Sequence, residues 1–535
     1  MEQGMNERIR KLRQQSTTTE PHLSIERAVL VTEAYQKYAG TVETPILRAL
    51  TFLYIMENKI LCINQDELIV GEKGAQPQAA PTYPELCCHT LEDLTIMNTR
   101  EKISFKVSQE TNRTHAETII PYWQNRALRK MIFSHMTPAW IDCYESGIFT
   151  EFMEQRGPGH TAADGKIYEK GFLDFKADIQ KALSSIDLLQ DEHAYAKKTQ
   201  LEAMAICCDS IITYGKRYAD YARKLAQQET NEIRRTELLE IANTCDVVPA
   251  HKPETFAQAI QMYWFIHIGV TTEINPWDAF SPGRLDQHLY PFYQKGIADG
   301  SLTRDKAKEL LECLWIKFNN QPAPPKVGIT LKESGTYTDF ANLNSGGVKP
   351  DGSDGVNDLS YLILDTMDEM KLLQPSSNVQ ISRKSPHAFV KRACEVSRKG
   401  WGQPAMYNTD AIIQELLRAG KDIIDAREGG ASGCVETGAF GKEAYILTGY
   451  LNLPKILELT LYNGFDKNTN KQLGLATGNA ADYATYEELF SAFKKQLHYF
   501  VDIKIKGNNI IEKIYATHMP VPFLSIVMSD CIVKG

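Results

Sequence analysis

Cys434 lies in a run of small residues and is followed two positions later by a carboxylate. Residues 428–438 read EGGASGCVETG. Glycine permits turns and close backbone approaches that other residues do not, so the run predicts a tight loop that places one cysteine in a confined space. In an extended or turn conformation, side chains two positions apart point to the same side. Cys434 and Glu436 could therefore face one substrate together.

The carboxylate of Glu436 argues against a nucleophilic role for Cys434. A nearby negative charge raises the pKa of a thiol and disfavours the thiolate, and residues 428–441 contain no histidine or cation that would lower it. The pairing fits a sulfur that donates and accepts a neutral hydrogen atom, while Glu436 transfers protons separately. A glycine-rich turn around a buried cysteine explains the same composition equally well.

The segments that must position this loop alternate between helices and short strands. Apolar residues recur at helical spacing over Ile25–Tyr38, Val42–Asn58, Thr90–Ser104, Tyr122–Phe133, Lys181–Ala226, Pro253–Ile268 and Arg304–Phe318. Short apolar or β-branched runs bounded by Gly, Pro and Asn predict buried strands at Val327–Leu331, Val379–Ser382 and Phe523–Val527. Asn275–Arg284 and Glu333–Lys349 are polar and predict long loops. The alternation predicts one large α/β domain with helices outside and strands inside.

Composition narrows the classes of function. The 535 residues carry a net charge of −8, which argues against nucleic acids and anionic membranes as partners, since both require a basic surface. No apolar run reaches the roughly 18 residues of a membrane span, and Gln261–Val270 is expected to be a buried core element. The N-terminus is polar and lacks an apolar signal region, so we expect a cytoplasmic protein.

The other motifs give no support to metal or nucleotide chemistry. The eleven cysteines include no CxxC and no Cys/His spacing of a zinc site, so most are expected to be small buried hydrophobes. The DGSDG run at 351–355 lacks the ligand register of a calcium loop. No GxGxxG opens a βα unit, and no GxxxxGK[ST] occurs.

Several separated motifs resemble those of one enzyme family. The sequence GCVE at 433–436 resembles the cysteine-loop signature of glycyl radical enzymes. Residues 280–287 (FSPGRLDQ), 453–464 (LPKILELTLYNG) and 68–72 (LIVGE) are similar to stretches of that family and stand in the expected order. The match runs from about Arg8 to the last residue. The resemblance implies a ten-stranded α/β barrel surrounded by helices, with the cysteine and glycine loops meeting at its centre.

Other motifs point to one branch of that family. Residues 156–161 (RGPGHT), 276–280 (PWDAF), 336–340 (TYTDF) and 438–445 (GAFGKEAY) look like the trans-4-hydroxy-L-proline dehydratase versions. The resemblance implies that a glycyl radical converts Cys434 to a thiyl radical, which removes a hydrogen from the ring carbon next to nitrogen. The adjacent hydroxyl then leaves as water, and the product is (S)-1-pyrroline-5-carboxylate.

The same resemblance implies roles for individual residues. Glu436 is expected to act as general base or acid, and His160 and Asp278 to supply the proton that the leaving hydroxyl needs. Asp339 would hold the substrate ammonium group, an opposite-charge role that suits a carboxylate, and Ser334 would lie near the substrate carboxylate. Aromatic side chains are expected to pack the ring, namely Phe152, Phe340 and Tyr450. Without the resemblance, core packing explains these three aromatic residues at least as well, and a helix cap explains Asp278.

The family pattern also includes a C-terminal glycine in a context like Arg-Val-Xaa-Gly-Tyr, which these residues lack. We therefore expect residues 1–535 to form a single pyruvate formate-lyase-like domain, C-terminally truncated, without the glycine radical domain. Gly535 lacks the context of a radical glycine. The implied partners are a radical S-adenosylmethionine activating enzyme, a complementing C-terminal fragment and a second copy in a homodimer. No bound cofactor or metal is expected, and the isolated chain is expected to be inactive.

Other classes of function stay open at this stage. The chain could be a non-catalytic pseudoenzyme that binds substrate or partner. It could also be a glycyl radical lyase or dehydratase for another small hydroxylated or aminated substrate. A conventional cysteine hydrolase is disfavoured, because no histidine lies near Cys434 in the sequence.

Overall fold

A computed structural model describes residues 4–151, 156–157, 161–275, 280–323, 327, 331–332, 340–433, 435–444 and 448–534. The helices are α1 (Glu7–Thr18), α2 (Glu26–Tyr38), α3 (Thr44–Asn58), α4 (Leu91–Thr99), α5 (Gln109–Thr114), a π-helix (His115–Ile119), α6 (Ile120–Trp123), α7 (Leu128–His135), α8 (Pro138–Glu145), α9 (Lys166–Glu169), α10 (Phe172–Ser184), α11 (Ala194–Gln228), α12 (Glu232–Val247), α13 (Phe256–Glu273), α14 (Leu285–Asp299), α15 (Arg304–Asn319), α17 (Asp358–Met370), α18 (His387–Ser397), α19 (Thr409–Arg418), α20 (Ile423–Glu428), α21 (Leu453–Leu461), a 3-10 turn (Ala480–Asp482), α22 (Tyr486–His518), α23 (Pro522–Val527) and α24 (Cys531–Lys534). The strands are β1 (His22–Ser24), β2 (Ala79–Pro81), β3 (Phe149–Glu151), β4 (Thr161–Ala162), β5 (Phe280–Ser281), β6 (Gly283–Arg284), β7 (Asn342–Gly346), β8 (Ser376–Ile381), β9 (Ala405–Asn408), β10 (Gly430–Ser432), β11 (Glu436–Gly438), β12 (Gly449–Leu451), β13 (Phe465–Asp466) and β14 (Lys471–Gln472).

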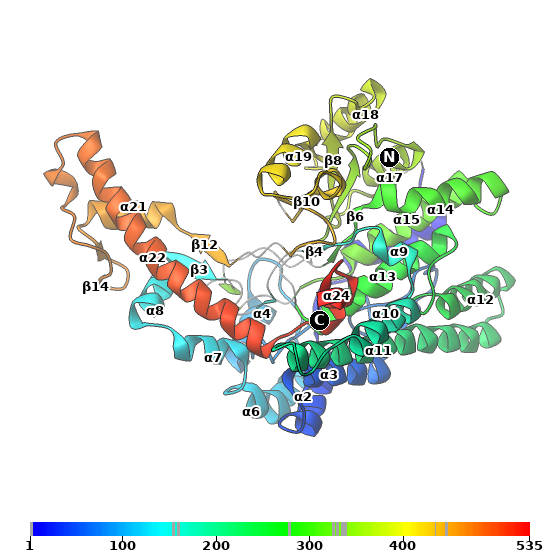
Figure 1. Ribbon diagram of the computed structural model, residues 1–535, viewed down its shortest axis with the longest axis horizontal. Coiled ribbons are helices and arrows are strands. Elements are labelled where there is room, and N and C mark those ends of the chain that lie inside the picture. The colour runs from blue at the N-terminus through cyan, green and yellow to red at the C-terminus, as the bar shows by residue number, and fades with distance from the viewer. Residues whose placement is uncertain are drawn as a thin grey trace.

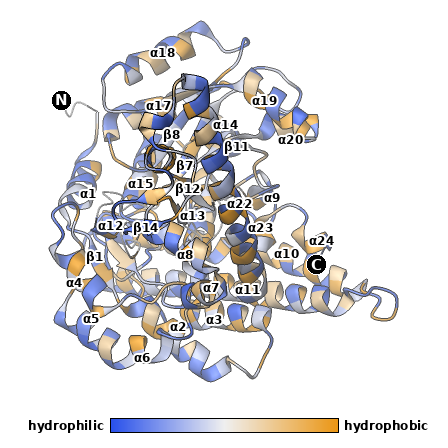
Figure 2. Ribbon diagram, turned by 90° about the vertical axis from the view of Figure 1, so that its left-hand side faces the viewer, coloured by the Kyte–Doolittle hydropathy of each residue, from blue (hydrophilic) through white to orange (hydrophobic). Residues whose placement is uncertain are grey.

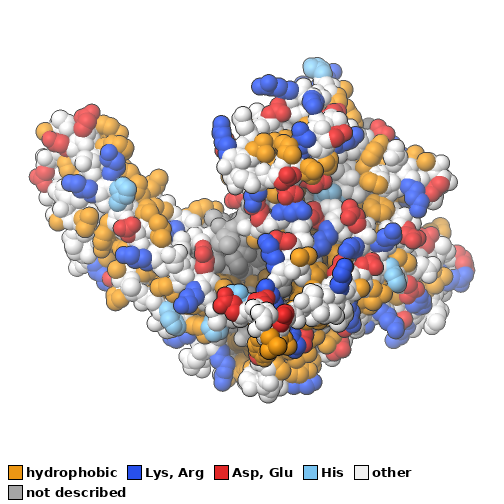
Figure 3. Space-filling model, viewed as in Figure 1, with side chains coloured by type: hydrophobic (Ala, Val, Ile, Leu, Met, Phe, Trp, Pro, Cys, Tyr) orange, Lys and Arg blue, Asp and Glu red, His pale blue; other side chains and the backbone are white. Residues whose placement is uncertain are grey.

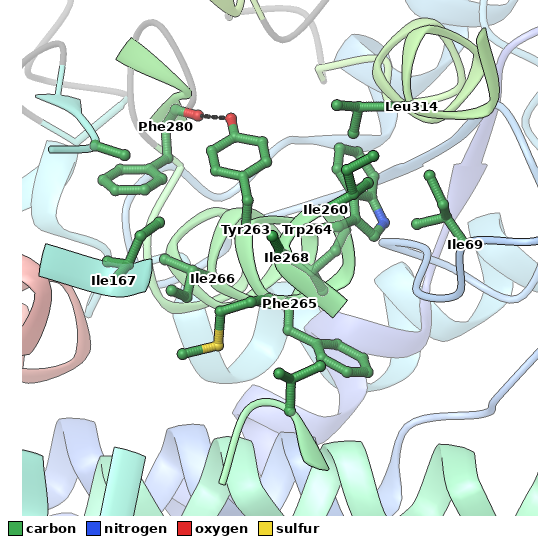
Figure 4. Close-up of a cluster of buried hydrophobic side chains, with 14 of the residues drawn as sticks. Ile69, Ile167, Ile260, Tyr263, Trp264, Phe265, Ile266, Ile268, Phe280 and Leu314 are labelled. Carbon is green, nitrogen blue, oxygen red and sulfur yellow. Dashed lines mark hydrogen bonds between the residues drawn. The ribbon is translucent and has the colours of Figure 1, made fainter. Parts of the chain in front are cut away.

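Helix α13 forms the centre of the main core. Its residues from Ala259 to Glu273 are buried on every side, as expected for a helix that is apolar all round. Figure 4 shows its side chains reaching Ile69, Ile167 and Leu314 on surrounding segments. The expectation of a buried core element at Gln261–Val270 is therefore confirmed. The outer helices carry hydrophilic and hydrophobic residues together (Figure 2).

A parallel sheet in the order β6-β7-β8-β9 lies beside this core. Leu343 and Val379 pack into the main apolar cluster, so the alternate residues of β7 and β8 point to the opposite face. That face carries Asn342, Asn344, Asn378 and Gln380, all at most 1% exposed. We call these four residues the amide face. A sheet with one apolar and one buried polar face needs hydrogen-bond partners on the polar side.

The α/β prediction is confirmed, but several predicted elements have different bounds. Val379–Ser382 lies largely in β8. The range Tyr122–Phe133 is divided between α6 and α7, and the helices predicted over Lys181–Ala226 are the end of α10 and most of α11. The predicted loops Asn275–Arg284 and Glu333–Lys349 contain β5, β6 and β7. Strands β5 and β6 have only two residues each, and β7 has polar residues on the amide face, so the sequence pattern did not indicate these strands. Of Val327–Leu331, the structure describes only the two end residues.

The strand predicted at Phe523–Val527 is wrong, because this segment is helix α23. Pro522 opens the helix, where a missing N–H costs nothing. The buried Glu273 carboxylate accepts hydrogen bonds from the backbone N–H groups of Phe523 and Leu524, at 2.8 and 3.0 Å. The first turn of the helix is thus satisfied by a residue far away in the sequence. Phe523 in turn packs against Phe172 and Phe52.

Helices α21 and α22 form an arm that projects from the body of the protein (Figure 1). A second apolar cluster joins the arm to α7, α8 and β3. Gly507 of α22 lies so close to Trp140 that an added Cβ would be 2.2 Å from the indole nitrogen. Large apolar side chains are exposed along the arm (Figure 3), among them Leu457, Tyr486 and Phe490.

Within the described ranges, no helix is both long enough and apolar enough to cross a membrane.

Buried histidines make the stability of this fold depend on pH. His267 of α13 is 0% exposed, and burial lowers its pKa to about 3. Below pH 6.5 the unfolded chain therefore binds a proton that the folded chain excludes, and stability falls as the pH falls. We expect His267→Gln to reduce the loss of unfolding free energy between pH 7.5 and 5.5 by about 1.4 kcal/mol. Urea unfolding at the two pH values measures this change.

The control for this prediction is His498→Gln, which replaces an exposed histidine of α22. It should leave the pH dependence as it is in the natural sequence. An unchanged pH dependence in His267→Gln would contradict the prediction.

Gly283 at the start of β6 permits a close approach that no other residue allows. Its φ is +65°, and an added Cβ would lie 2.1 Å from the Ala163 carbonyl oxygen. We expect Gly283→Ala to cost about 3 kcal/mol or more of unfolding free energy, since backbone strain and overlap add. Gly300 is the matched control, with φ +76° and no atom within 4 Å of an added Cβ. Gly300→Ala should cost only about 1–2 kcal/mol, and equal costs in urea unfolding would refute the argument.

Candidate active site

The cysteine segment forms a β-hairpin. Strands β10 and β11 pair antiparallel, with Ala431 opposite Thr437 and Ser432 opposite Glu436. Gly433 has a φ of +61°, the left-handed conformation that short hairpin loops use. The tight turn predicted from the glycines is therefore present. Cys434 itself lies outside the described residues.

Alternate carbonyls of the segment leading to the hairpin bind to side chains of the parallel sheet. The Arg284 guanidinium donates to the carbonyl of Arg427 at 2.7 Å, and the Gln380 amide donates to that of Gly429 at 3.1 Å. The Asn344 amide donates to the carbonyl of Ala431 at 2.7 Å, and the Asn342 amide to that of Gly433 at 2.5 Å. We call these four bonds the carbonyl ladder. They hold the chain from the end of α20 through β10 to the turn, and within the extended part every second carbonyl points the same way.

The ladder has further contacts that fix its register. Asn344 Oδ1 accepts from the Ala431 N–H at 3.1 Å and from Gln380 Nε2 at 3.1 Å. A Cβ added to Gly430 would lie 2.2 Å from Gln380 Nε2, so the approach requires glycine. A shift by one residue would present N–H groups to donor amides, which is unfavourable. The position of the hairpin is thus set by the amide face.

Arg284 connects the ladder to the rest of the sheet. It is 2% exposed and also donates to the carbonyls of Gly346 and Val348. Burial lowers the pKa of its guanidinium. Asp286 accepts from the Gly346 N–H at 2.7 Å and from the Ser360 hydroxyl at 2.5 Å. The FSPGRLDQ motif therefore consists largely of residues that hold the sheet and the hairpin together.

The described ends of two predicted site loops lie side by side. Before them, the Gly157 N–H donates to the Asn275 carbonyl at 2.6 Å, and Arg156 Nη2 donates to Asn275 Oδ1 at 3.0 Å. After them, β4 pairs parallel with β5, with Thr161 opposite Phe280. His160 directly precedes Thr161 and Asp278 precedes Phe280 by two residues. The described residues on either side of His160 therefore lie next to those on either side of Asp278.

The carbonyl of Phe280 is held by two side chains of α13. Tyr263 Oη donates to it at 2.5 Å, as Figure 4 shows, and His267 Nδ1 lies 3.1 Å from it. His267 is stacked on Trp264, with ring centroids 4.6 Å apart. The residue that follows the Asp278 loop is thus tied to the most buried helix.

Three of the predicted site residues fall within the described structure. Glu436 is half-buried at the start of β11, and its Oε2 accepts from the Val435 N–H at 2.9 Å. Phe340 is half-buried just before β7, and Tyr450 is 56% exposed in β12, opposite Thr150 of β3. The others lie outside the described residues, namely Cys434, His160, Asp278, Asp339, Ser334 and Phe152. Their convergence on one substrate stays a prediction.

Charged groups lie at the start of the hairpin segment. Burial raises the pKa of Glu428, which directly precedes the glycines, while the positive charge of Arg284 opposes this shift. Elsewhere, burial raises the pKa of the thiols of Cys62, Cys143 and Cys313 to about 12, as expected for cysteines that only pack. The described residues contain no cluster of His, Cys, Asp and Glu that could hold a metal ion.

Sequence reasoning missed Asn342, Asn344 and Gln380 and gave Arg284 no role. A weak signal existed in the alternation Asn342-Leu343-Asn344, which has the period of a strand with one apolar face. Nothing in the sequence pairs these residues with carbonyls about 50 to 140 positions away.

Comparisons with known proteins identify the family. The pyruvate formate lyase-like family model matches residues 5–535. The chain is 65% identical to trans-4-hydroxy-L-proline dehydratase of Clostridioides difficile, over 100% of this chain and 68% of that protein. The crystal structure of hydroxyproline dehydratase from Clostridioides difficile with trans-4-hydroxy-L-proline bound matches with a TM-score of 0.97 at 65% identity, covering 100% of this chain and 68% of that one.

A more distant structure has the same fold. A glycyl radical enzyme from Archaeoglobus fulgidus matches with a TM-score of 0.91 at 31% identity, over 99% of this chain and 67% of that chain. The chain thus spans about two thirds of the length of these relatives. The resemblance to glycyl radical enzymes is confirmed: the chain belongs to the pyruvate formate lyase-like family and has its α/β fold.

Proposed function

We propose that this chain carries the thiyl-forming cysteine of a glycyl radical dehydratase. The reaction is the conversion of trans-4-hydroxy-L-proline to (S)-1-pyrroline-5-carboxylate and water. The observation that carries the proposal is the 65% identity over all 535 residues to trans-4-hydroxy-L-proline dehydratase. Identity to relatives with other substrates is much lower, at 29% for an isethionate sulfite-lyase and for a sulfopropanediol dehydratase.

In this reaction Cys434 would transfer hydrogen atoms, and other residues would transfer protons. Cys434 would become a thiyl radical by giving the hydrogen atom of its thiol to a glycyl radical. Cys434 would remove a hydrogen atom from the ring carbon next to nitrogen, and the adjacent hydroxyl would take up a proton and leave as water. The ring nitrogen would lose a proton as the C=N bond forms, and Cys434 would return a hydrogen atom to the carbon that lost the hydroxyl. The substrate loses H₂O in total, and the cysteine ends as it began.

Hydroxide is a poor leaving group, so its departure requires an acid. We assign His160 and Asp278 to the hydroxyl and Glu436 to the general base or acid. The pairing of the two loop ends, Thr161 with Phe280, supports a shared role for His160 and Asp278. Asp339 would bind the ammonium group and Ser334 would lie near the carboxylate, with Phe152, Phe340 and Tyr450 around the ring.

The proposal includes partners that the family resemblance implies. A radical S-adenosylmethionine activating enzyme would generate the radical, on a glycine contributed by polypeptide outside these 535 residues. That polypeptide would continue the same chain or be a complementing fragment. We further propose a cytoplasmic homodimer, in which residues 1–535 form one pyruvate formate-lyase-like domain.

The function is tested with residues 1–535 together with the polypeptide that carries the glycine, activated without oxygen by a radical S-adenosylmethionine activating enzyme. We expect an organic radical doublet in electron paramagnetic resonance and formation of pyrroline-5-carboxylate from trans-4-hydroxy-L-proline. Glycerol and isethionate should not turn over. Residues 1–535 alone should give no glycyl doublet, because they lack the glycine motif. Turnover of another substrate, or a radical without any turnover, would contradict the proposal.

Cys434→Ser should abolish turnover while the glycyl radical still forms, because a hydroxyl does not give up its hydrogen atom to a glycyl radical. The matched control is Cys394→Ser, which replaces an exposed cysteine of α18 and should retain full activity. Radical yield and product formation are measured on the same samples. Activity in Cys434→Ser would disprove the role of this cysteine.

Glu436→Gln should lower kcat by about 10²–10⁴-fold, the usual contribution of general acid–base catalysis, with the radical yield unchanged. Glu443→Gln is the matched control in the segment that follows the hairpin. Glu443 accepts from the Ala439 N–H at 2.9 Å and pairs with Lys421. Its replacement should change kcat less than threefold, and equal effects of the two substitutions would rule out a specific role for Glu436.

A further inference from the structure

The last bond of the carbonyl ladder lies next to the cysteine. Asn342 Nδ2 donates to the carbonyl of Gly433 at 2.5 Å, and Cys434 is the next residue in the chain. Beyond this bond, the Val435 N–H is bound by the side chain of Glu436 within the hairpin itself. Among the contacts of the described residues, Asn342 is thus the point of the sheet that holds the hairpin nearest to Cys434.

A bond to the Gly433 carbonyl fixes more than one atom. The peptide group that joins Gly433 to Cys434 is planar, and its C=O and N–H point in opposite directions. Holding the carbonyl therefore restrains the plane of the peptide that follows Gly433. Gly433 has left-handed geometry, with φ +61°, and glycine resists rotation less than any other residue. Without the bond from Asn342, the Gly433 backbone would therefore be less restrained.

The orientation of the Asn342 amide is determined by its surroundings. The side chain is 1% exposed, so water does not compete for its donor. Turning the amide over would place Oδ1 against the Gly433 carbonyl oxygen, and two acceptors repel each other. Oδ1 has no hydrogen-bond partner within the described residues. The Nδ2 bond to Gly433 is therefore what this buried side chain contributes.

Asn342 also connects the cysteine to both other segments of the proposed site. Its backbone N–H donates to the Ser281 hydroxyl at 3.1 Å. Ser281 follows Asp278 by three residues, and Asn342 follows Asp339 by three residues. One residue thus links the chain on which Cys434 lies to the chains on which the proposed proton donor and ammonium ligand lie.

We propose that Asn342 is a positioning residue for the cysteine hairpin, which holds the Gly433 carbonyl and so restrains the peptide that leads into Cys434. The inference rests on the proposed function and adds to it a residue that touches neither substrate nor radical. A positioning residue affects the rate of hydrogen-atom transfer more than substrate affinity, because this transfer depends steeply on the distance between the reacting atoms.

The test compares Asn342→Ala with Asn319→Ala in the full-length protein. Asn319 is a second buried asparagine, whose Nδ2 donates to the Ser16 hydroxyl at 2.8 Å, remote from the hairpin in the sequence and not part of the ladder. For Asn342→Ala we expect kcat to fall at least tenfold with KM changed less than threefold and with the glycyl radical yield unchanged. Backbone amides of residues 430–438 should exchange with deuterium at least tenfold faster. Asn319→Ala should show neither effect.

A conservative variant keeps the test decisive if Asn342→Ala does not fold. Asn342→Leu keeps the approximate size of the side chain but has no donor at any pH, and should behave like Asn342→Ala. Unchanged exchange in residues 430–438 overturns the inference, as does faster exchange with unchanged kcat. Deuterium exchange is measured without turnover. If the enzyme with the natural sequence does not dehydrate hydroxyproline, the proposed function is overturned. The exchange comparison still decides whether Asn342 holds the hairpin.

Discussion

The structure around the cysteine depends on a buried polar sheet face that must find hydrogen-bond partners. Each buried donor left without a partner costs about 1–3 kcal/mol. The amide and guanidinium groups of Asn342, Asn344, Gln380 and Arg284 find theirs in carbonyls of residues 427–433. These carbonyls are equally in need of donors. The sheet and the cysteine segment therefore satisfy each other, and displacing either one leaves several buried groups unpaired at once.

This mutual dependence explains why the sheet has two unlike faces. Leu343 and Val379 join the apolar core that surrounds α13, so hydrophobic burial fixes where the strands lie. Packing in the core thereby fixes the position of the amide face, and the hydrogen bonds of the amide face fix the position of the hairpin. The same helix holds the Phe280 carbonyl through Tyr263 and His267. One buried helix thus determines, through different contacts, the placement of two segments of the proposed site.

Local patterns were enough to predict some of this arrangement. The glycines around Cys434 predicted the tight turn, and an all-round apolar run predicted the buried helix α13. Local patterns failed where distant residues decide the outcome. Phe523–Val527 reads as a strand, but the Glu273 carboxylate binds its first N–H groups and makes it a helix. The polar sequence of strand β7 predicts a loop. Asn342 and Asn344 are buried there because they donate to carbonyls about 90 residues later in the chain, which a local pattern does not show.

The surroundings of the hairpin fit hydrogen-atom transfer better than nucleophilic catalysis. Residues 428–441 include no cation or histidine that would stabilise a thiolate, and the ladder surrounds the segment with neutral amides and one guanidinium directed at carbonyls. A hydrogen-atom transfer moves no net charge, so it needs no cation beside the sulfur. Proton transfer creates or removes charge and needs a group that water can help to solvate. Glu436, half-buried at the edge of the hairpin, has that access, and the two steps can therefore be carried by neighbouring residues with opposite requirements.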